Sequence, residues 1–225
     1  MKLLTIGLPS SFIPVINPDF KHADYTPLDL SRDNKALDIE VLKDPERHHI
    51  QLQEFLKEKQ AKVAYGGYLE QRKLYDRSDY FQATHPDDTR NIHLGIDLWC
   101  DAGTEVIAPL DGKIHSFQEN TNFGDYGPTI ILSHEVNGYA FHTLYGHLSK
   151  ESLDKLEVGK EVKAGQQIAT LGRPFENGDY APHLHFQIVI DMQGNQGDYP
   201  GVCSKNSLPF YKENCPDPNI LLNIY

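Results

Sequence analysis

Hydrophobic and polar residues alternate along the stretch PHLHFQIVI, which begins at Pro182. Side chains of a strand point alternately to the two faces of a sheet. One face would carry His183, His185, Gln187 and Val189, and the apolar face would carry Leu184, Phe186, Ile188 and Ile190. Two imidazoles side by side on one strand indicate a metal site, although a chance pair on a solvated face fits the same pattern.

Similar short β-type runs, separated by Gly, Pro, Asn and Asp, fill the chain after about residue 90. We expect strands at residues 105–108, 112–118, 129–134, 139–146, 167–171 and 183–191. Asn137-Gly138, which lies between two of these runs, is typical of a tight hairpin. Many short strands with little helix predict a mainly β fold with an antiparallel β-sheet core.

The first 89 residues have a different pattern. A helix is predicted from Asp44 to Lys62, because Asp44 can cap it and apolar side chains recur at helical spacing. Gly66-Gly67 is expected to end this helix. We therefore expect a partly helical N-terminal extension with one helix at residues 1–89, packed on a core domain at residues 90–225.

The composition excludes several classes of protein. The 225 residues include 32 acidic and 21 basic side chains, which give a formal charge of −11. Nucleic-acid binding needs clustered Lys and Arg, so we expect no nucleic-acid partner. No run approaches the roughly 18 apolar residues of a membrane span, and no clear signal peptide is visible. We expect a soluble, cytoplasmic protein, and the sequence does not indicate its oligomeric state.

The three cysteines and most of the eleven histidines need separate interpretations. Cys100, Cys203 and Cys215 are too widely spaced for a metal knuckle or a disulfide framework, so a reducing compartment is the simpler interpretation. The sequence assigns no partner to His22 and His85. Exposed positions on the predicted helix are expected for His48 and His49, and structural roles on strands for His115, His134 and His142.

Seven histidines lie between His93 and His185, which makes this region the candidate site. If HLGID is extended, His93 and Asp97 share one face, and only Gly95 lies between them on that face. Imidazole nitrogen and carboxylate oxygen are ligands that Zn²⁺ accepts. His147, at the end of a predicted strand, could complete a metal site or act as an acid or base. Gln187 could orient a ligand.

Four stretches together resemble a known family. HLGID, TLYGHLS, VGKEVKAGQQIATLG and PHLHFQI are similar to the successive motifs of the lysostaphin-type zinc metallopeptidases, over about residues 90–191. Known members cleave peptide cross-links in bacterial cell walls. The resemblance implies a groove-bearing antiparallel β-sheet core related to barrel-sandwich hybrids. It also implies that His93, Asp97 and His185 bind Zn²⁺, and that His147 and His183 are the catalytic pair.

The sequence also departs from that family. Residues 172–181 form a longer and more charged loop than the usual short turn, and Gln187 stands where an acidic residue is common. These departures favour a peptide or small amide-containing substrate other than a Gly-rich wall peptide. GGYLEQRKLYDRSDYF, DYGPTIILSHE, FENGDYAPHLHFQI and PDPNILL are similar to a subgroup found fused to kinase-like and aminotransferase domains.

The most direct functional interpretation is a zinc-dependent hydrolase, in its simplest form a metallo-endopeptidase. One alternative is a zinc-binding, non-catalytic module with a small-molecule or protein ligand. A carrier domain is another, because VGKEVKAGQQIATLG also resembles biotinyl and lipoyl carriers, but Lys163 lacks the residue context of a carrier lysine. A further hypothesis is that the N-terminal segment, residues 1–64, covers the groove and keeps the enzyme inactive.

Overall fold

The computed structural model describes residue 8, residues 11–78 and residues 81–225. Its strands are β1 (Tyr25–Pro27), β2 (Val63–Gly66), β3 (Ile92–His93), β4 (Ile96–Trp99), β5 (Glu105–Ile107), β6 (Gly112–Asn120), β7 (Gly127–Val136), β8 (Tyr139–Gly146), β9 (Glu161–Val162), β10 (Gln167–Thr170), β11 (His183–Val189) and β12 (Val202–Cys203). Its α-helices are α1 (Ile39–Leu42), α2 (Pro45–Lys59), α3 (Leu208–Asn214) and α4 (Asn219–Leu222). Short 3₁₀ turns are η2 (His22–Asp24), η3 (Leu74–Arg77), η5 (Pro86–Asp88) and η6 (Lys150–Leu153).

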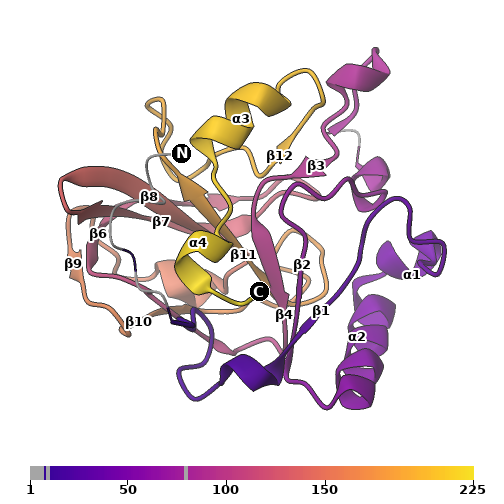
Figure 1. Cartoon of the computed structure of the whole chain (residues 1–225), viewed down its shortest axis with the longest axis horizontal. Coiled ribbons are helices and arrows are strands. Elements are labelled where there is room, and N and C mark those ends of the chain that lie inside the picture. Colours follow the sequence, from indigo (N-terminus) through magenta and orange to yellow (C-terminus); the bar gives the residue numbers. More distant parts are fainter. Residues whose placement is uncertain (1–7, 9–10, 79–80) are drawn as a thin grey trace.

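One eight-stranded sheet dominates the molecule, in the order β1-β2-β4-β11-β8-β7-β6-β9. Its neighbouring strands are antiparallel except β1 and β2. Two further pairs are β10 with β5 and β12 with β3. Helices α1 and α2 lie beside the β1 edge, and β6 and β9 lie at the opposite edge (Figure 1). The predicted mainly β fold with an antiparallel core is confirmed, and so is the hairpin at Asn137-Gly138, which joins β7 to β8.

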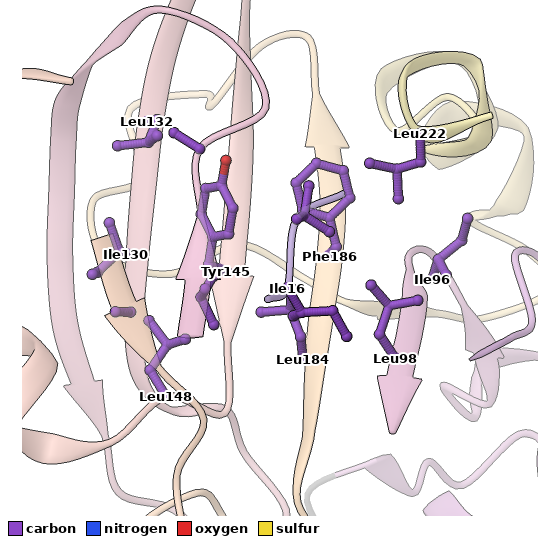
Figure 2. Packing of buried hydrophobic residues seen from close by; sticks show 14 of the residues in the cluster. Ile16, Ile96, Leu98, Ile130, Leu132, Tyr145, Leu148, Leu184, Phe186 and Leu222 are labelled. Carbon is purple, nitrogen blue, oxygen red and sulfur yellow. The ribbon is translucent and has the colours of Figure 1, made fainter. Parts of the chain in front are cut away.

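Strand β11 lies near the middle of the sheet, between β4 and β8. Its apolar residues Leu184, Phe186 and Ile188 are fully buried in the main hydrophobic cluster. Ile96 and Leu98 of β4 belong to the same cluster, and Figure 2 shows them packed beside Leu184 and Phe186. This packing fixes which face of β11 lies in the hydrophobic cluster, so the side chains of His183 and His185 are directed to the other face of the sheet.

The N-terminal part of the chain contributes strands to this sheet. Strand β2 pairs with β4 through Ala64, Tyr65 and Gly66, and β1 pairs with the other side of β2. Residues before position 67 therefore extend the sheet beyond β4. The domain boundary near residue 90 stays a prediction.

Helix α2 begins where the sequence predicts and ends earlier. The Asp44 side chain accepts hydrogen bonds from the N–H groups of Glu46 and Arg47, as expected for a cap. Gln60 adopts a left-handed conformation and closes the helix, because its N–H donates to the carbonyls of the last turn. The predicted end at Gly66-Gly67 was therefore wrong, since residues 63–66 form β2. No helix in the described part of the chain is long and apolar enough to cross a membrane.

The exposed position predicted for His48 is also wrong. His48 is only 5% exposed, and it lies on the same helix face as the buried residues Leu52 and Leu56. Residues four and eight positions apart share a helix face, so His48 belongs to the apolar stripe. His49 faces another direction and is half-buried, with Nε2 3.5 Å from Asp101 Oδ1.

Truncation of Phe186 tests the packing on the apolar face of β11. Phe186→Ala should lower the free energy of unfolding by about 3–5 kcal/mol, because it leaves a cavity in the fully buried cluster. Val158, which is 68% exposed, offers a control: Val158→Ala should change stability by less than about 0.5 kcal/mol. Urea unfolding followed by circular dichroism measures both, and equal small effects would contradict the packing.

Burial of His48 should make stability depend on pH. Burial lowers the pKa of His48 to about 3, with a further contribution from His183, whereas an unfolded histidine titrates near 6.5. Between these values the unfolded chain binds the extra proton, so stability falls as the pH falls through this window. His48→Gln should flatten the pH dependence of urea unfolding. An equally steep dependence in His48→Gln would contradict this prediction.

Candidate functional site

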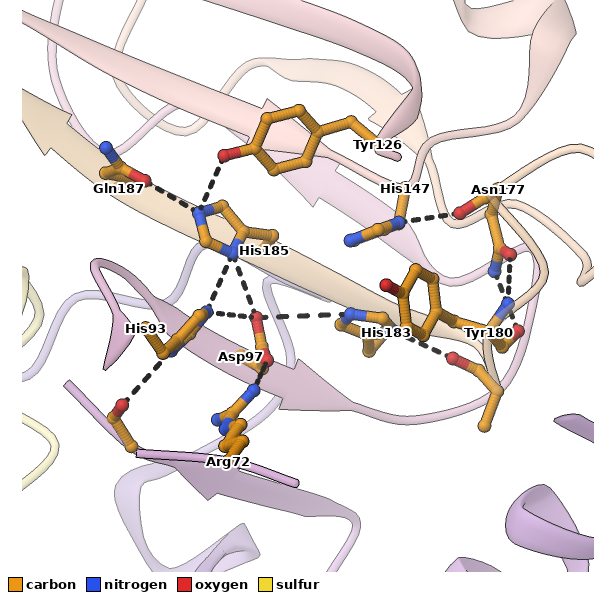
Figure 3. Close-up of polar contacts among 12 residues, drawn as sticks. Arg72, His93, Asp97, Tyr126, His147, Asn177, Tyr180, His183, His185 and Gln187 are labelled. Atoms are coloured by element: carbon orange, nitrogen blue, oxygen red, sulfur yellow. Dashed lines mark hydrogen bonds and ion pairs between the residues drawn. The ribbon is translucent and has the colours of Figure 1, made fainter. Parts of the chain in front are cut away.

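Three buried side chains converge into one group that could hold a metal ion: His93, Asp97 and His185. His93 Nε2 and His185 Nδ1 each lie 3.2 Å from Asp97 Oδ1. The two nitrogens are 2.9 Å apart (Figure 3). Each of the three residues is at most 3% exposed. The structure thus brings together the three residues predicted as ligands.

The pairing of β4 with β11 creates this group. Asp97 on β4 lies directly opposite His185 on β11, and His93 lies four residues before Asp97 on β3. A Cβ atom at Gly95 would lie 2.7 Å from His185 Cε1, so a larger residue there would collide with the imidazole. Glycine at this position gives His185 the room to approach His93 and Asp97.

In both His93 and His185, the ring nitrogen that faces away from the metal group lies against an oxygen acceptor. His93 Nδ1 lies 3.1 Å from the carbonyl oxygen of Gly67. His185 Nε2 lies 2.8 Å from Gln187 Oε1, and the amide nitrogen of Gln187 donates to the Pro200 carbonyl at 3.1 Å. Gln187 therefore lies where it can orient His185, as the sequence suggested.

The two histidines predicted as the catalytic pair lie next to each other beside the metal group. The ring centroids of His147 and His183 are 4.2 Å apart. His183 Nε2 lies 4.0 Å from Asp97 Oδ1. His147 Nδ1 donates to the Asn177 carbonyl at 2.6 Å, and His183 Nδ1 donates to the Ala181 carbonyl at 2.7 Å. Their Nε2 atoms are left free of these backbone contacts.

The long loop at residues 172–181 supports the catalytic pair. Asn177 is fully buried, and its side chain bonds to the backbone of Gly172 and Tyr180. These bonds hold the Asn177 carbonyl against His147. Tyr180 packs edge-on against His147 and His183, with ring centroids 5.0 and 5.6 Å away. The residues that depart from the family pattern thus position the two imidazoles.

Burial keeps His93, His147 and His183 neutral near pH 7. It lowers the pKa of His93 to about 4, with a further contribution from the Arg72 guanidinium. Burial likewise holds the pKa of His147 well below its ordinary value and lowers that of His183. Burial would raise the pKa of Asp97, but the opposing charge of the Arg72 guanidinium acts in the other direction, and that pKa lies well below its usual range. The site therefore combines neutral imidazoles with a carboxylate.

Two site residues were missed by the sequence analysis. Arg72, which is 1% exposed, donates from Nη1 to Asp97 Oδ2 (Figure 3). The Tyr126 hydroxyl lies 3.5 Å from His185 Nε2 and donates to the Tyr199 carbonyl at 3.1 Å. Neither residue stands in a metal-ligand spacing. Both lie in stretches that resemble the family subgroup, which is the signal that could have pointed to them.

A cavity of about 80 Å³ adjoins the metal group and the catalytic pair. Asp97, His147, His183 and His185 line it, together with His48. Tyr75, Phe81 and Val202, which pack together as a small apolar cluster, also line it. The functional groups thus face a common pocket.

The histidines expected to be structural have partners away from this cavity. His134 contacts the Asp111 carbonyl through Nδ1 at 2.8 Å and the Thr143 hydroxyl through Nε2 at 2.7 Å. His115 and His142 pack edge to face, with centroids 4.8 Å apart. His22 Nε2 lies 2.8 Å from the Ile224 carbonyl, and His85 caps η5.

The family model described as peptidase family M23 matches residues 91–198. Over 99 residues the chain is 34% identical to an uncharacterized metalloprotease of Haemophilus influenzae, a match that covers 44% of this chain and 19% of the relative. It is 32% identical over 120 residues to the glycyl-glycine endopeptidase ALE-1 of Staphylococcus capitis, covering 53% and 29% of the two chains.

The catalytic domain of lysostaphin from Staphylococcus simulans is 31% identical in structural alignment, which covers 54% of this chain and 80% of that domain with a TM-score of 0.38. The chain spans less than a third of the length of the two curated relatives. The family resemblance of the sequence motifs is confirmed over the matched region: residues 91–198 of this chain belong to peptidase family M23.

Proposed function

We propose that His93, Asp97 and His185 bind one Zn²⁺ and that the chain is a zinc-dependent metallo-endopeptidase. The observation that carries this proposal is a set of hydrogen bonds that fixes which ring nitrogens of His93 and His185 carry lone pairs. A carbonyl oxygen only accepts hydrogen bonds, so His93 must carry its proton on Nδ1, facing Gly67. In a neutral imidazole the other nitrogen, Nε2, then has a lone pair.

The same reasoning applies to His185. The amide nitrogen of Gln187 donates to the Pro200 carbonyl, so the Gln187 oxygen faces His185 Nε2 and accepts a hydrogen bond from its N–H group. His185 Nδ1 therefore has a lone pair that points towards His93 Nε2 and Asp97 Oδ1. Three electron-rich atoms within 3.2 Å of one another, in a buried site, repel each other unless a cation lies between them.

The size and chemistry of this group fit Zn²⁺. With ligand distances of about 2.0–2.1 Å, tetrahedral zinc places its ligand atoms roughly 3.3 Å apart. The three separations here are 2.9, 3.2 and 3.2 Å. Two imidazole nitrogens and one carboxylate oxygen form a ligand set typical of catalytic zinc, which keeps a fourth position open.

The chain's own residues can carry the proton transfers of peptide hydrolysis. When bound, the ion supplies Lewis-acid polarisation of the scissile carbonyl and lowers the pKa of an attacking water. His147 and His183 each have a neutral Nε2 beside the metal group, since their Nδ1 atoms donate to backbone carbonyls. One of them accepts the proton of the attacking water, and an imidazolium formed in this way can protonate the departing amine.

We infer that the substrate is a peptide with small residues beside the scissile bond. The cavity volume of about 80 Å³ supports this, because it leaves little room for large side chains next to the metal group. The printed name of one relative, a glycyl-glycine endopeptidase, agrees with small flanking residues. We further infer kinship with the subgroup fused to kinase-like and aminotransferase domains, which is supported by GGYLEQRKLYDRSDYF, the stretch that contains Arg72.

The contact between Gln187 and His185 should set the zinc affinity. Gln187→Leu removes the acceptor that selects the His185 tautomer, so zinc affinity should fall about 10–100-fold. Gln187→Glu keeps an acceptor at the same place and should retain the affinity. Competition with a chromogenic chelator measures both variants. Wild-type affinity in Gln187→Leu would contradict the proposed role of the tautomer.

Hydrolysis should depend on the catalytic pair, whereas zinc binding should not. His147→Ala and His183→Ala should each retain zinc and lose activity on a library of short synthetic peptides by about 10²–10⁴-fold, the usual contribution of general acid–base catalysis. His142→Ala is the matched control, because His142 pairs with His115 away from the cavity, and it should stay active.

Three results would count against the proposal. A zinc content well below one per wild-type chain would reject the metal site. Turnover unchanged in both variants would reject the catalytic pair. Zinc-loaded wild-type protein that cleaves no peptide would instead favour the zinc-binding, non-catalytic module.

A further inference from the structure

Residues that precede the family-matched region contact the metal group and the loop that supports His147. Gly67 accepts the His93 hydrogen bond, and Arg72 donates to Asp97. Further along the same segment, Arg77 donates from Nη2 to the Asp179 carbonyl at 2.7 Å. All three residues lie before residue 91, where the family match begins. The site of this chain therefore includes contacts from a segment outside the family-matched region.

Arg72 is held rigidly between two carboxylates. Its Nε donates to Glu70 Oε2 and its Nη1 donates to Asp97 Oδ2, both at 2.5 Å. Glu70 is fixed in turn, because its other oxygen accepts the Leu30 N–H at 3.1 Å. The planar guanidinium has its donors in fixed directions, so these contacts determine its orientation. Arg72 thus presents a charged donor to one particular oxygen of Asp97.

The two oxygens of Asp97 consequently face different partners. Oδ1 lies 3.2 Å from both His93 Nε2 and His185 Nδ1, on the side of the metal group. Oδ2 faces Arg72. An aspartate without such a partner can turn both oxygens towards a cation, which raises the coordination number. With Oδ2 engaged by Arg72, only Oδ1 remains available.

We propose that Arg72 is a positioning residue that keeps Asp97 a one-oxygen ligand, so that the metal keeps a fourth position open for water or substrate. The inference rests on the proposed zinc site and adds a role for the N-terminal part of the chain. It explains why a fully buried arginine stands beside a metal site, where its charge alone would oppose cation binding. What Arg72 contributes is a coordination geometry with three protein ligands and one free position.

Cobalt substitution of the full chain tests this role without measuring activity. The visible absorption of Co²⁺ is intense when the ion is four-coordinate and weak at higher coordination numbers. Wild-type protein with one bound Co²⁺ should show the intense absorption. Arg72→Met removes the donors to Oδ2, so the cobalt protein should lose most of that intensity as Oδ2 joins the ion. Arg72→Lys, which restores a charged donor, should recover it at least in part.

A matched control separates this role from general stability. Arg77→Met removes an arginine of the same segment that contacts the loop at residues 178–179, away from Asp97, so its cobalt absorption should stay intense.

Two outcomes would overturn the role of Arg72 alone. One is intense absorption retained in Arg72→Met with Co²⁺ bound. The other is weak absorption, typical of a higher coordination number, in the wild-type protein, which decides the matter even if Arg72→Met does not fold. Failure of the wild-type protein to bind Co²⁺ would overturn the proposed metal site and this inference with it.

Discussion

The antiparallel pairing of β4 with β11 is the constraint on which the other features depend. It places Asp97 opposite His185 on one face, and it packs Ile96, Leu98 and the apolar residues of β11 together on the other. A slip of one residue in either strand would move the imidazoles into the hydrophobic cluster and the apolar residues to the cavity. The burial of the core therefore also sets the geometry of the site.

Hydrogen bonds to oxygen acceptors then determine what the buried site can do. Each of the four imidazoles has one nitrogen against an acceptor oxygen, supplied by Gly67, Asn177, Ala181 and Gln187. These contacts place the remaining lone pairs towards the metal group or the adjoining cavity. In a site shielded from water, such contacts hold the tautomers more firmly than solvent would. The result is a set of oriented imidazole nitrogens arranged around a carboxylate.

The sequence could predict the strands from its patterns, and the resemblance of its motifs to a known family implied the three candidate ligands. Alternation along β11 is visible in PHLHFQIVI, and glycine between His93 and Asp97 indicates a close approach. The acceptors could not be predicted, because three of them are backbone carbonyls that any residue offers. No sequence spacing could have indicated Arg72, because its contact with Asp97 depends on the path that the chain takes after β2. His48 was misjudged, although its position four residues before Leu52 places it on the buried face of α2.

An anomalous-difference map of crystals of the zinc-loaded protein, recorded at the zinc absorption edge, tests the central claim most directly. The account predicts one peak per chain, about 2.0–2.1 Å from His93 Nε2, Asp97 Oδ1 and His185 Nδ1. A peak at His185 Nε2, a peak that engages both oxygens of Asp97, or no peak in this group would contradict it.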